Sequence, residues 1–388
     1  MPPELGKQHE PGLTAWVRTL NDILLSTDLS GQCFYKASPV SRRARASAPW
    51  VELLTRQGRF SKLRRRAASD RQLAVASTVG TIMSLLVFLA FLSLFTTQYV
   101  PVWMTENEAQ HGDEVLTQMA CIRSATDLLI LSGDRDTSSF CAIKMGANGV
   151  PVFAAPTAGI ITLSSREPSV PATDQERADA NIVEVNYNDS TTGVPRAGQS
   201  AGRLELYMPN RYFVQQTYAF ENGGIVLNQT DGEWMRVGPH LRAERTGNTL
   251  VNMSFRIMSF VGKTESQVGV NAIGIKLRLM NVIDPEDHFY GATGCPTDPT
   301  VAISNRTTTI IIYSNYVKAW QRWWDSTLQD YGLSSSAPVP NPCPAPNNIP
   351  ADYTISVSGL RITVVIRNLS YFSLTEATFN VKMGEETR

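Results

Sequence analysis

Four histidines are the side chains best suited to transfer protons or bind metals near neutral pH: His9, His111, His240 and His288. They are scattered along the chain, and none belongs to an HExxH pattern or another paired-ligand spacing. The dinucleotide pattern GxGxxG and the P-loop pattern GxxxxGKS/T are absent as well. The sequence therefore predicts no catalytic residue, no cofactor and no metal site, and a protein that is not an enzyme.

Two other groups of residues could bind a ligand. The range Asp284–His288 gathers acidic side chains, whose oxygens are ligands that divalent cations prefer. Trp320, Trp323 and Trp324 could stack on surface glycans, but their spacing also fits one face of an amphipathic helix. We favour a solvated turn for the first group and core packing for the second.

The cysteines could form disulfides. Five are present, none at CxxC spacing, and four of them follow the apolar segment described below: Cys33, Cys121, Cys141, Cys295 and Cys343. An even number suits two disulfides in an oxidising compartment, and three pairings are possible. Sequence order favours Cys121–Cys141 and Cys295–Cys343, with buried unpaired thiols as the alternative.

Asparagine sequons also follow that segment. Five Asn-x-Ser/Thr patterns occur, none of them in the first 71 residues: Asn188, Asn228, Asn252, Asn305 and Asn368. They are possible N-glycosylation sites if this part of the chain is exported.

An apolar segment precedes all these residues. The chain carries no charge from Gln72 to Thr105, and within this stretch Leu73–Phe95 is strongly apolar. As a helix these 23 residues would be about 34 Å long, against a hydrocarbon core of about 30 Å. Tyr99 and Trp103 follow where aromatic rings sit at a membrane interface, and Pro101 should kink or end the helix. We predict a transmembrane helix over 72–102.

Charge predicts the orientation of this helix. Lysine plus arginine equals aspartate plus glutamate at 35 each, so no nucleic-acid partner is expected. Eleven basic side chains nevertheless gather between Lys36 and Arg71, just before the apolar segment. For Arg64-Arg65-Arg66 among them, attraction to anionic lipid is preferred over a nucleic-acid arm. The positive-inside rule then places a largely disordered segment 1–71 in the cytoplasm and the rest of the chain outside the cell. A cleaved signal peptide is the competing interpretation.

The exported part is expected to be mainly β. An amphipathic stalk helix over 103–132 should carry Val115, Met119, Ile122 and Leu129 on one face and pack either on its own domain, which we favour, or on other subunits. Over 150–388, period-two patterns predict an antiparallel β-sandwich, with one inserted helix at 314–332. The expected strands are Val150–Leu163, Ile182–Tyr187, Arg203–Tyr207, Tyr212–Phe220, Gly224–Leu227, Val251–Val261, Gln267–Met280, Val301–Ser304, Thr307–Tyr313, Tyr353–Arg367 and Ser370–Met383.

Several stretches resemble one family. Thr78–Met83 followed by Leu85–Phe95 resembles the amino-terminal helix of archaeal type IV pilin-like and archaellin-like proteins. Further stretches are similar to uncharacterised archaeal membrane proteins of that architecture and to their extracellular β-domain: Tyr99–Met104, Glu106–His111, Asn210–Tyr218 and Glu221–Leu227. The resemblance covers roughly residues 70–388.

The resemblance implies how the chain is processed and what it does. Arg66-Ala67-Ala68-Ser69 is similar to a prepilin-peptidase site, with cleavage after Ala67 or nearby. A cut chain could assemble with like subunits through its apolar helix. We therefore expect a non-enzymatic, single-pass, pilin-like protein of the cell surface, structural or adhesive in role. The alternative is a monomeric membrane-tethered binding module, such as a receptor or adhesin, that forms no filament.

Overall fold

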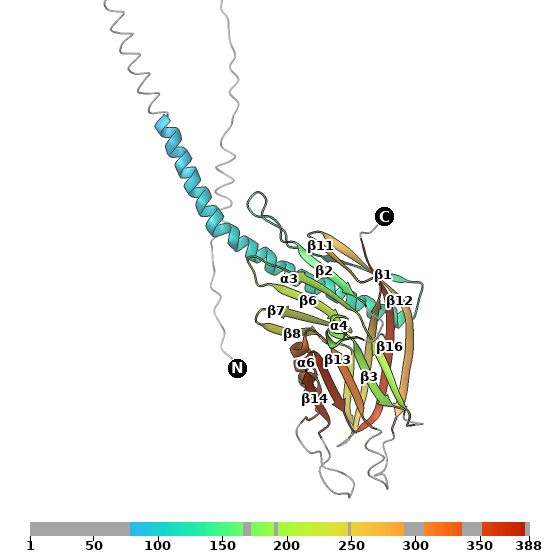
Figure 1. Ribbon diagram of the computed structural model, residues 1–388. Helices are drawn as coiled ribbons and strands as arrows, with labels where there is room; N and C mark the ends of the chain where they lie inside the picture. Colours follow the sequence, from blue (N-terminus) through green and yellow to red (C-terminus); the bar gives the residue numbers. More distant parts are fainter. Residues whose placement is uncertain are drawn as a thin grey trace, which may run out of the picture. The chain divides into compact units, whose positions relative to one another are not determined.

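The computed structural model of the chain is mainly β, as predicted, and one long helix leads into its sheets (Figure 1). The structure describes residues 78–165, 172–189, 193–246, 250–290, 306–335 and 351–384, with backbone alone at 284–286. The chain divides after Ile82 into two units, and all the sheets belong to the second unit, Met83–Arg388. The expected segment 1–71, the Arg66–Ser69 processing site and the strand Val301–Ser304 lie outside the described residues.

The long helix runs without interruption from Thr78 to Ser132. Pro101, expected to kink or end it, is instead taken up in the first turn of α3 (Val100–Ser132). Proline has no N–H to offer the carbonyl one turn earlier. The turn before it is a π-helix, η1 (Phe95–Tyr99), in which the N–H of Val100 donates to the carbonyl of Phe95. This wider turn lets the backbone continue past the proline, so that the predicted transmembrane and stalk helices are one element.

The strands form three sheets, where one sandwich was expected. Sheet 1 has the order β1 (Ser138–Lys144), β12 (Ala272–Phe289), β16 (Leu369–Gly384), β10 (Leu250–Val261), β9 (Leu241–Thr246). Sheet 2 has the order β11 (Glu265–Gly269), β2 (Gly159–Ser164), β5 (Arg203–Met208), β6 (Gln216–Glu221), β7 (Gly224–Gln229), β8 (Gly232–Val237). Sheet 3 has the order β14 (Tyr353–Ser358), β15 (Arg361–Ile366), β13 (Thr308–Tyr313), β3 (Val183–Asn188), β4 (Pro195–Ser200).

Most neighbouring strands are antiparallel, but β10 and β16 pair in parallel at the middle of sheet 1. The prediction of a purely antiparallel sandwich was therefore wrong. A parallel pair needs a long connection between its strands, and here the whole of β11 to β15 lies between them. Such a pairing leaves no local turn signal in the sequence.

Sheet 1 separates two hydrophobic cores. Sheet 2 and α3 pack with one end of sheet 1, and sheet 3 packs with its other end. Along β10, odd-numbered residues up to Ile257 face the core shared with sheet 3, and even-numbered residues from Met258 face the core shared with sheet 2. The paired strand β16 makes the same switch between Leu374 and Ala377, which lies opposite Met258. Successive side chains of a strand point to opposite faces, so the two cores lie on opposite faces of sheet 1.

Two shorter helices complete the fold. The predicted insert is α6 (Val317–Asp330), which packs on β8, β14 and β15. The helix α4 (Asp174–Asp179) was not predicted; Thr173 caps it, accepting from the N–H of Glu176, whose carboxylate accepts from the N–H of Thr173. This reciprocal capping box stabilises a helix too short to carry a periodic apolar face.

The strands missed by the sequence patterns share one position in the sheets. β1, β4, β8 and β9 are all edge strands. An edge strand often carries polar and charged residues that discourage pairing with other chains, as β9 does with Arg242, Glu244 and Arg245. Alternation of apolar residues is weak in such strands, so the sequence pattern identified mainly the inner ones.

Candidate functional site

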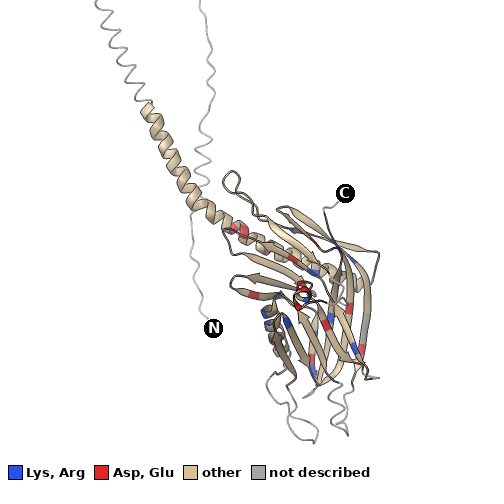
Figure 2. Cartoon of the chain, in the orientation of Figure 1, with Lys and Arg blue, Asp and Glu red and all other residues tan. Residues whose placement is uncertain are grey.

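The first half of the long helix is exposed and apolar. Among the helices of the described residues, this one is long and apolar enough to cross a membrane. None of its most apolar 18-residue window is buried by the fold. Figure 2 shows that this half carries no charged side chain, and the first acid is Glu106. A helix that is apolar all round is suited to lipid or to other apolar helices and unsuited to water.

The second half of the same helix belongs to the domain core. The predicted face of Val115, Met119, Ile122 and Leu129 is buried against sheets 1 and 2, which confirms that the helix packs on its own domain. Gly133 ends the helix in a left-handed conformation with φ of 64°. A disulfide joins Cys121 of α3 to Cys141 of β1, the first of the two expected pairs. The helix is thereby tied covalently to the edge of sheet 1.

Glu108 joins the helix to two loops at the point where it enters the domain. Its side chain is completely buried, yet the structure shows no lysine or arginine paired with it among the described residues. The carboxylate instead accepts hydrogen bonds from backbone N–H groups of Arg211 (3.1 Å), Tyr212 (2.8 Å) and Phe213 (2.7 Å). It also accepts from Oγ1 of Thr157 at 2.9 Å. Charge-assisted hydrogen bonds to several donors offset the desolvation of a buried carboxylate.

Three aromatic side chains, Phe95, Tyr99 and Trp103, follow one another at four-residue spacing on the helix before Glu108. Phe95 contacts Trp103 and Phe153, with ring centroids 5.5 Å and 5.0 Å apart. Tyr99 is exposed with its ring centroid 6.0 Å from that of Phe95, and Tyr212 is exposed in the loop whose backbone binds Glu108. Phe153 and Tyr212 come from the two loops that Glu108 and its neighbours hold. We call Phe95, Tyr99, Trp103, Phe153 and Tyr212 the aromatic collar.

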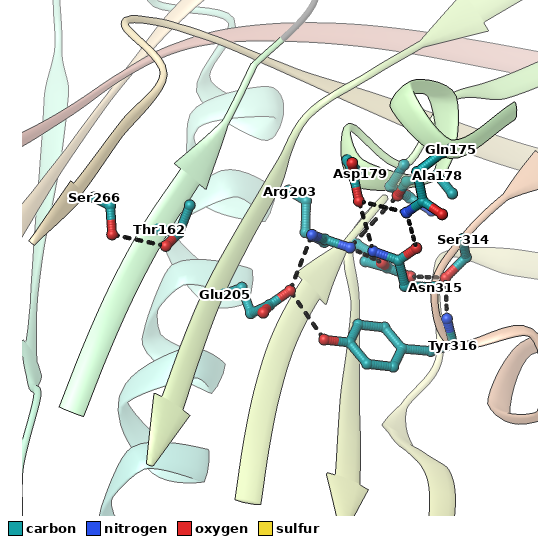
Figure 3. A network of polar contacts seen from close by, with 12 residues as sticks. Thr162, Gln175, Ala178, Asp179, Arg203, Glu205, Ser266, Ser314, Asn315 and Tyr316 are labelled. Atoms are coloured by element: carbon teal, nitrogen blue, oxygen red, sulfur yellow. Dashed lines mark hydrogen bonds and ion pairs between the residues drawn. The ribbon is translucent and has the colours of Figure 1, made fainter. Parts of the chain in front are cut away.

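A second group of polar residues is buried between sheet 2 and α6 (Figure 3). The carboxylate of Glu221 accepts from Oγ of Ser314 and from Nε1 of Trp320, both at 2.7 Å, and its other oxygen lies 3.8 Å from Nη1 of Arg203. Arg203 also pairs with Glu205, which accepts from the hydroxyl of Tyr316. Complete burial raises the pKa of Glu221 to about 7, against the opposing effect of Arg203 and the hydrogen bonds.

Shifted carboxyl groups are common in active sites, but burial argues for a structural role here. The side chain of Glu221 is closed off from solvent, and that of Arg203 is nearly so. A substrate could not reach the carboxylate without unpacking α6. The network therefore fastens α6 to sheet 2.

The three histidines that the structure describes lie in different settings, and His9 lies outside the described residues. His111 is buried in α3 and bonds through Nε2 to the carbonyl of Lys144, and burial lowers its pKa. His240 lies 2.7 Å from Oδ1 of Asp127. His288 is buried and its ring packs 4.9 Å from that of Tyr187. No group of three metal-ligating side chains occurs within the described ranges.

The other candidate ligand-binding residues are placed as follows. Trp320 and Trp324 are buried in the sheet 3 core, as favoured from their spacing, whereas Trp323 is partly exposed. The solvated turn favoured for Asp284–His288 is wrong, because this range lies within β12 and pairs with β16. There Asp287 accepts a hydrogen bond from the hydroxyl of Tyr371 at 2.7 Å. The side chains of residues 284–286 lie outside the description, as do Cys33, Cys295 and Cys343.

Four of the five sequons fall on described residues, and they differ in access. Asn188, Asn228 and Asn252 are partly exposed in β3, β7 and β10, while Asn305 lies outside the description. The side-chain nitrogen of Asn368, which would carry the glycan, is buried. Glycosylation stays a prediction for all of them.

One serine motif was overlooked when no catalytic residue was predicted. Gly198–Gly202 reads Gly-Gln-Ser-Ala-Gly, which fits the GxSxG pattern of nucleophilic serines. That pattern requires a turn from a strand into a helix, with the serine exposed. Ser200 instead ends β4 before the strand β5, is buried, and donates to Oδ1 of Asn222. These contacts indicate a structural role for Ser200.

Glu108 and Glu221 were also missed by sequence reasoning. Glu108 carried a usable signal, because it lies four residues after Met104 and three before His111, on the stripe that continues to Val115. A charged residue on the buried face of a helix predicts a specific partner. Glu221 ends a strand of ordinary appearance, and nothing in its neighbourhood announces Ser314 or Trp320, which lie 93 and 99 residues away.

Comparison of the chain with protein-family models, with curated proteins and with solved structures finds no match. The pilin-like resemblance therefore rests on the residues quoted for it and stays a prediction.

Proposed function

We propose that this chain is a non-enzymatic membrane protein that displays a β-rich domain at the cell surface on a single helix. One observation carries the proposal: the same helix is wholly exposed and apolar at its start and buried in the domain core at its end. An exposed apolar surface of this size is unfavourable in water and favourable in a bilayer. The basic residues before it favour a cytoplasmic amino terminus.

Two forms of this function differ in what surrounds the apolar half. A monomeric tether would keep it in lipid, whereas a pilin-like subunit would also pack it against the helices of other subunits. The pilin-like form is supported by the uninterrupted helix, since domain and apolar half form one element without a hinge. The role of the domain would be structural or adhesive in either form, and surface glycans are possible ligands.

Membrane anchoring is tested by charge substitution within the helix. The double variant Leu85→Lys and Leu89→Lys places two charges where the chain has none. Each would cost roughly 3 kcal/mol at the centre of a bilayer. We expect the native chain to stay in the membrane pellet after alkaline extraction and the variant to be released. Leu128→Lys, on an exposed position of α3, is the matched control and should behave like the native chain. Release of the native chain would contradict the proposal.

The amino terminus of the native protein distinguishes the two forms. A mature terminus between Ala67 and Leu73, found by intact mass and amino-terminal sequencing, would support pilin-type processing. An intact Met1 would support the monomeric tether. Protease added to intact cells should digest the β-domain and spare the amino-terminal segment; the opposite pattern would contradict the orientation.

A further inference from the structure

The turn between β1 and β2 is a closed loop without charge. No charged residue occurs from Met145 to Ser165. Backbone hydrogen bonds in both directions between Ala147 and Thr157 close the base of the loop. Nearer its tip, the N–H groups of Phe153 and Ala154 both donate to the carbonyl of Val150. We call Gly149–Pro156 the Val152 loop.

The tip of this loop presents apolar side chains to the outside of the domain. Val152 is 100% exposed and Phe153 is 42% exposed. Val152 also has a φ of 71°, which β-branched residues rarely adopt because of steric clashes. An unfavourable backbone conformation that holds out an apolar side chain points to a function for that side chain rather than to stability of the domain.

The loop lies beside the helix at the level where the helix would leave a bilayer. The ring of Phe153 packs on that of Phe95, with centroids 5.0 Å apart. The sequence carries no charge from Gln72 onward, and about 20 residues of a helix cross a hydrocarbon core, so a span that starts there is expected to end between about Phe91 and Phe95. From Phe95 to Trp103 the helix rises by about 12 Å, which matches a headgroup layer and its aromatic belt.

The position of the loop is held from inside the domain. Thr157, at its base, donates to Glu108, and Glu108 also holds Tyr212 of the neighbouring loop. Both loops are therefore fixed to the helix at the same carboxylate. The Val152 loop cannot swing away from the helix without breaking these bonds.

We propose that the Val152 loop is a second membrane contact, inserted with the aromatic collar into the interfacial layer of the bilayer that the helix crosses. The inference rests on the proposed membrane anchoring. Lipid is the occupant because the loop is uncharged, is apolar at its tip, and meets the apolar helix through the contact of Phe153 with Phe95. With two points of contact the domain would be held at a fixed tilt to the membrane, which a single helix does not impose.

Depth-dependent quenching in vesicles tests the proposal. An environment-sensitive fluorescent amino acid replaces Val152 in the full chain, and the chain is reconstituted in phosphatidylcholine vesicles. The matched control carries the same probe at Val357, an exposed valine of β14. We expect the probe at 152 to lie within about 10 Å of the boundary between headgroups and acyl chains. It should be quenched by lipids spin-labelled high on the acyl chain and shielded from iodide, whereas the probe at 357 should show the reverse.

The outcomes separate this proposal from membrane anchoring. Loss of the reconstituted chain on alkaline extraction would overturn the proposed function. A retained chain whose probes at 152 and 357 are equally accessible to iodide would overturn only the loop contact. The measurement is repeated with about one chain in each vesicle. If the probe at 152 is then no longer shielded from iodide, a second copy of the chain covers the loop, and the lipid contact is overturned. An unchanged melting temperature of both labelled chains establishes that the domain is intact.

Discussion

Glu108 is a charged residue whose removal should weaken the fold more than its size suggests. Glu108→Ala leaves the N–H groups of Arg211, Tyr212 and Phe213 without their acceptor in a partly buried place. We expect a loss on the order of 3 kcal/mol in the free energy of unfolding, because unpaired buried donors lose their solvation. Denaturant unfolding of the full chain in detergent measures it.

Glu114→Ala is the matched control on the same helix. Glu114 pairs with Lys144 at 3.5 Å, with its side chain 47% exposed. An ion pair of this kind contributes less than about 1 kcal/mol. Equal losses for the two variants would show that the hydrogen bonds of Glu108 do not stabilise the loops.

Glu221 predicts a pH dependence of stability. Its pKa is about 7 in the folded chain against an ordinary value of 4.5, so between these pH values the folded state keeps a proton that the unfolded state has released. Stability from this group therefore falls as pH rises from about 4.5 to 7. The isosteric variant Glu221→Gln lacks this titration. As the pH rises from about 4.5 to 7, the free energy of unfolding of the variant should therefore increase relative to that of the native protein, by on the order of 3 kcal/mol. A native-to-variant difference that is constant with pH would contradict the raised pKa.

At the scale of elements, α3 offers a matched pair of apolar substitutions. Met119 is fully buried against the sheets, whereas Leu128 is 70% exposed on the same helix. Met119→Ala should cost about 2–4 kcal/mol of stability through lost contacts and a cavity. Leu128→Ala should change it by less than about 0.5 kcal/mol. Melting of both variants in detergent measures the difference, and a larger effect at Leu128 would place that face in a contact with another chain.

The same helix shows how much could be predicted from the sequence. The apolar segment and the stripe of Val115 to Leu129 follow from hydrophobic periodicity alone, and both are found. The three-sheet arrangement does not follow, because β10 and β16 each turn one end to one core and the other end to the second core. Their apolar pattern changes phase within the strand, which a search for simple alternation treats as noise.

Only the part of the candidate site that is local in sequence could be predicted. Tyr99 and Trp103 were predicted to be interfacial because they follow the apolar segment in sequence. Phe153, Tyr212 and Glu108 join them only through the fold, across separations such as the 104 residues between Glu108 and Tyr212. Long-range contacts of this kind leave no local signal in one sequence.

At the scale of the whole molecule, the apolar half of the helix and the β-domain should be thermodynamically separable. From Val79 to Leu94 the large apolar side chains other than Leu92 are exposed, and the helix first becomes buried at Val100. A domain that gains little packing from the anchor should not need it in order to fold. This separation is what a display function requires, since the domain must stay folded outside the bilayer.

Two truncations test this separation. A chain lacking residues 1–97 keeps Val100, Met104 and Glu108, so we expect it to be soluble without detergent and to melt within about 2 °C of the full chain. A chain lacking residues 1–112 loses those buried side chains and the bonds of Glu108, and should be strongly destabilised or fail to fold. Thermal unfolding followed by circular dichroism compares the two. If the first truncation were as unstable as the second, the domain would depend on its anchor, and the helix would be a part of the fold along its whole length rather than a tether.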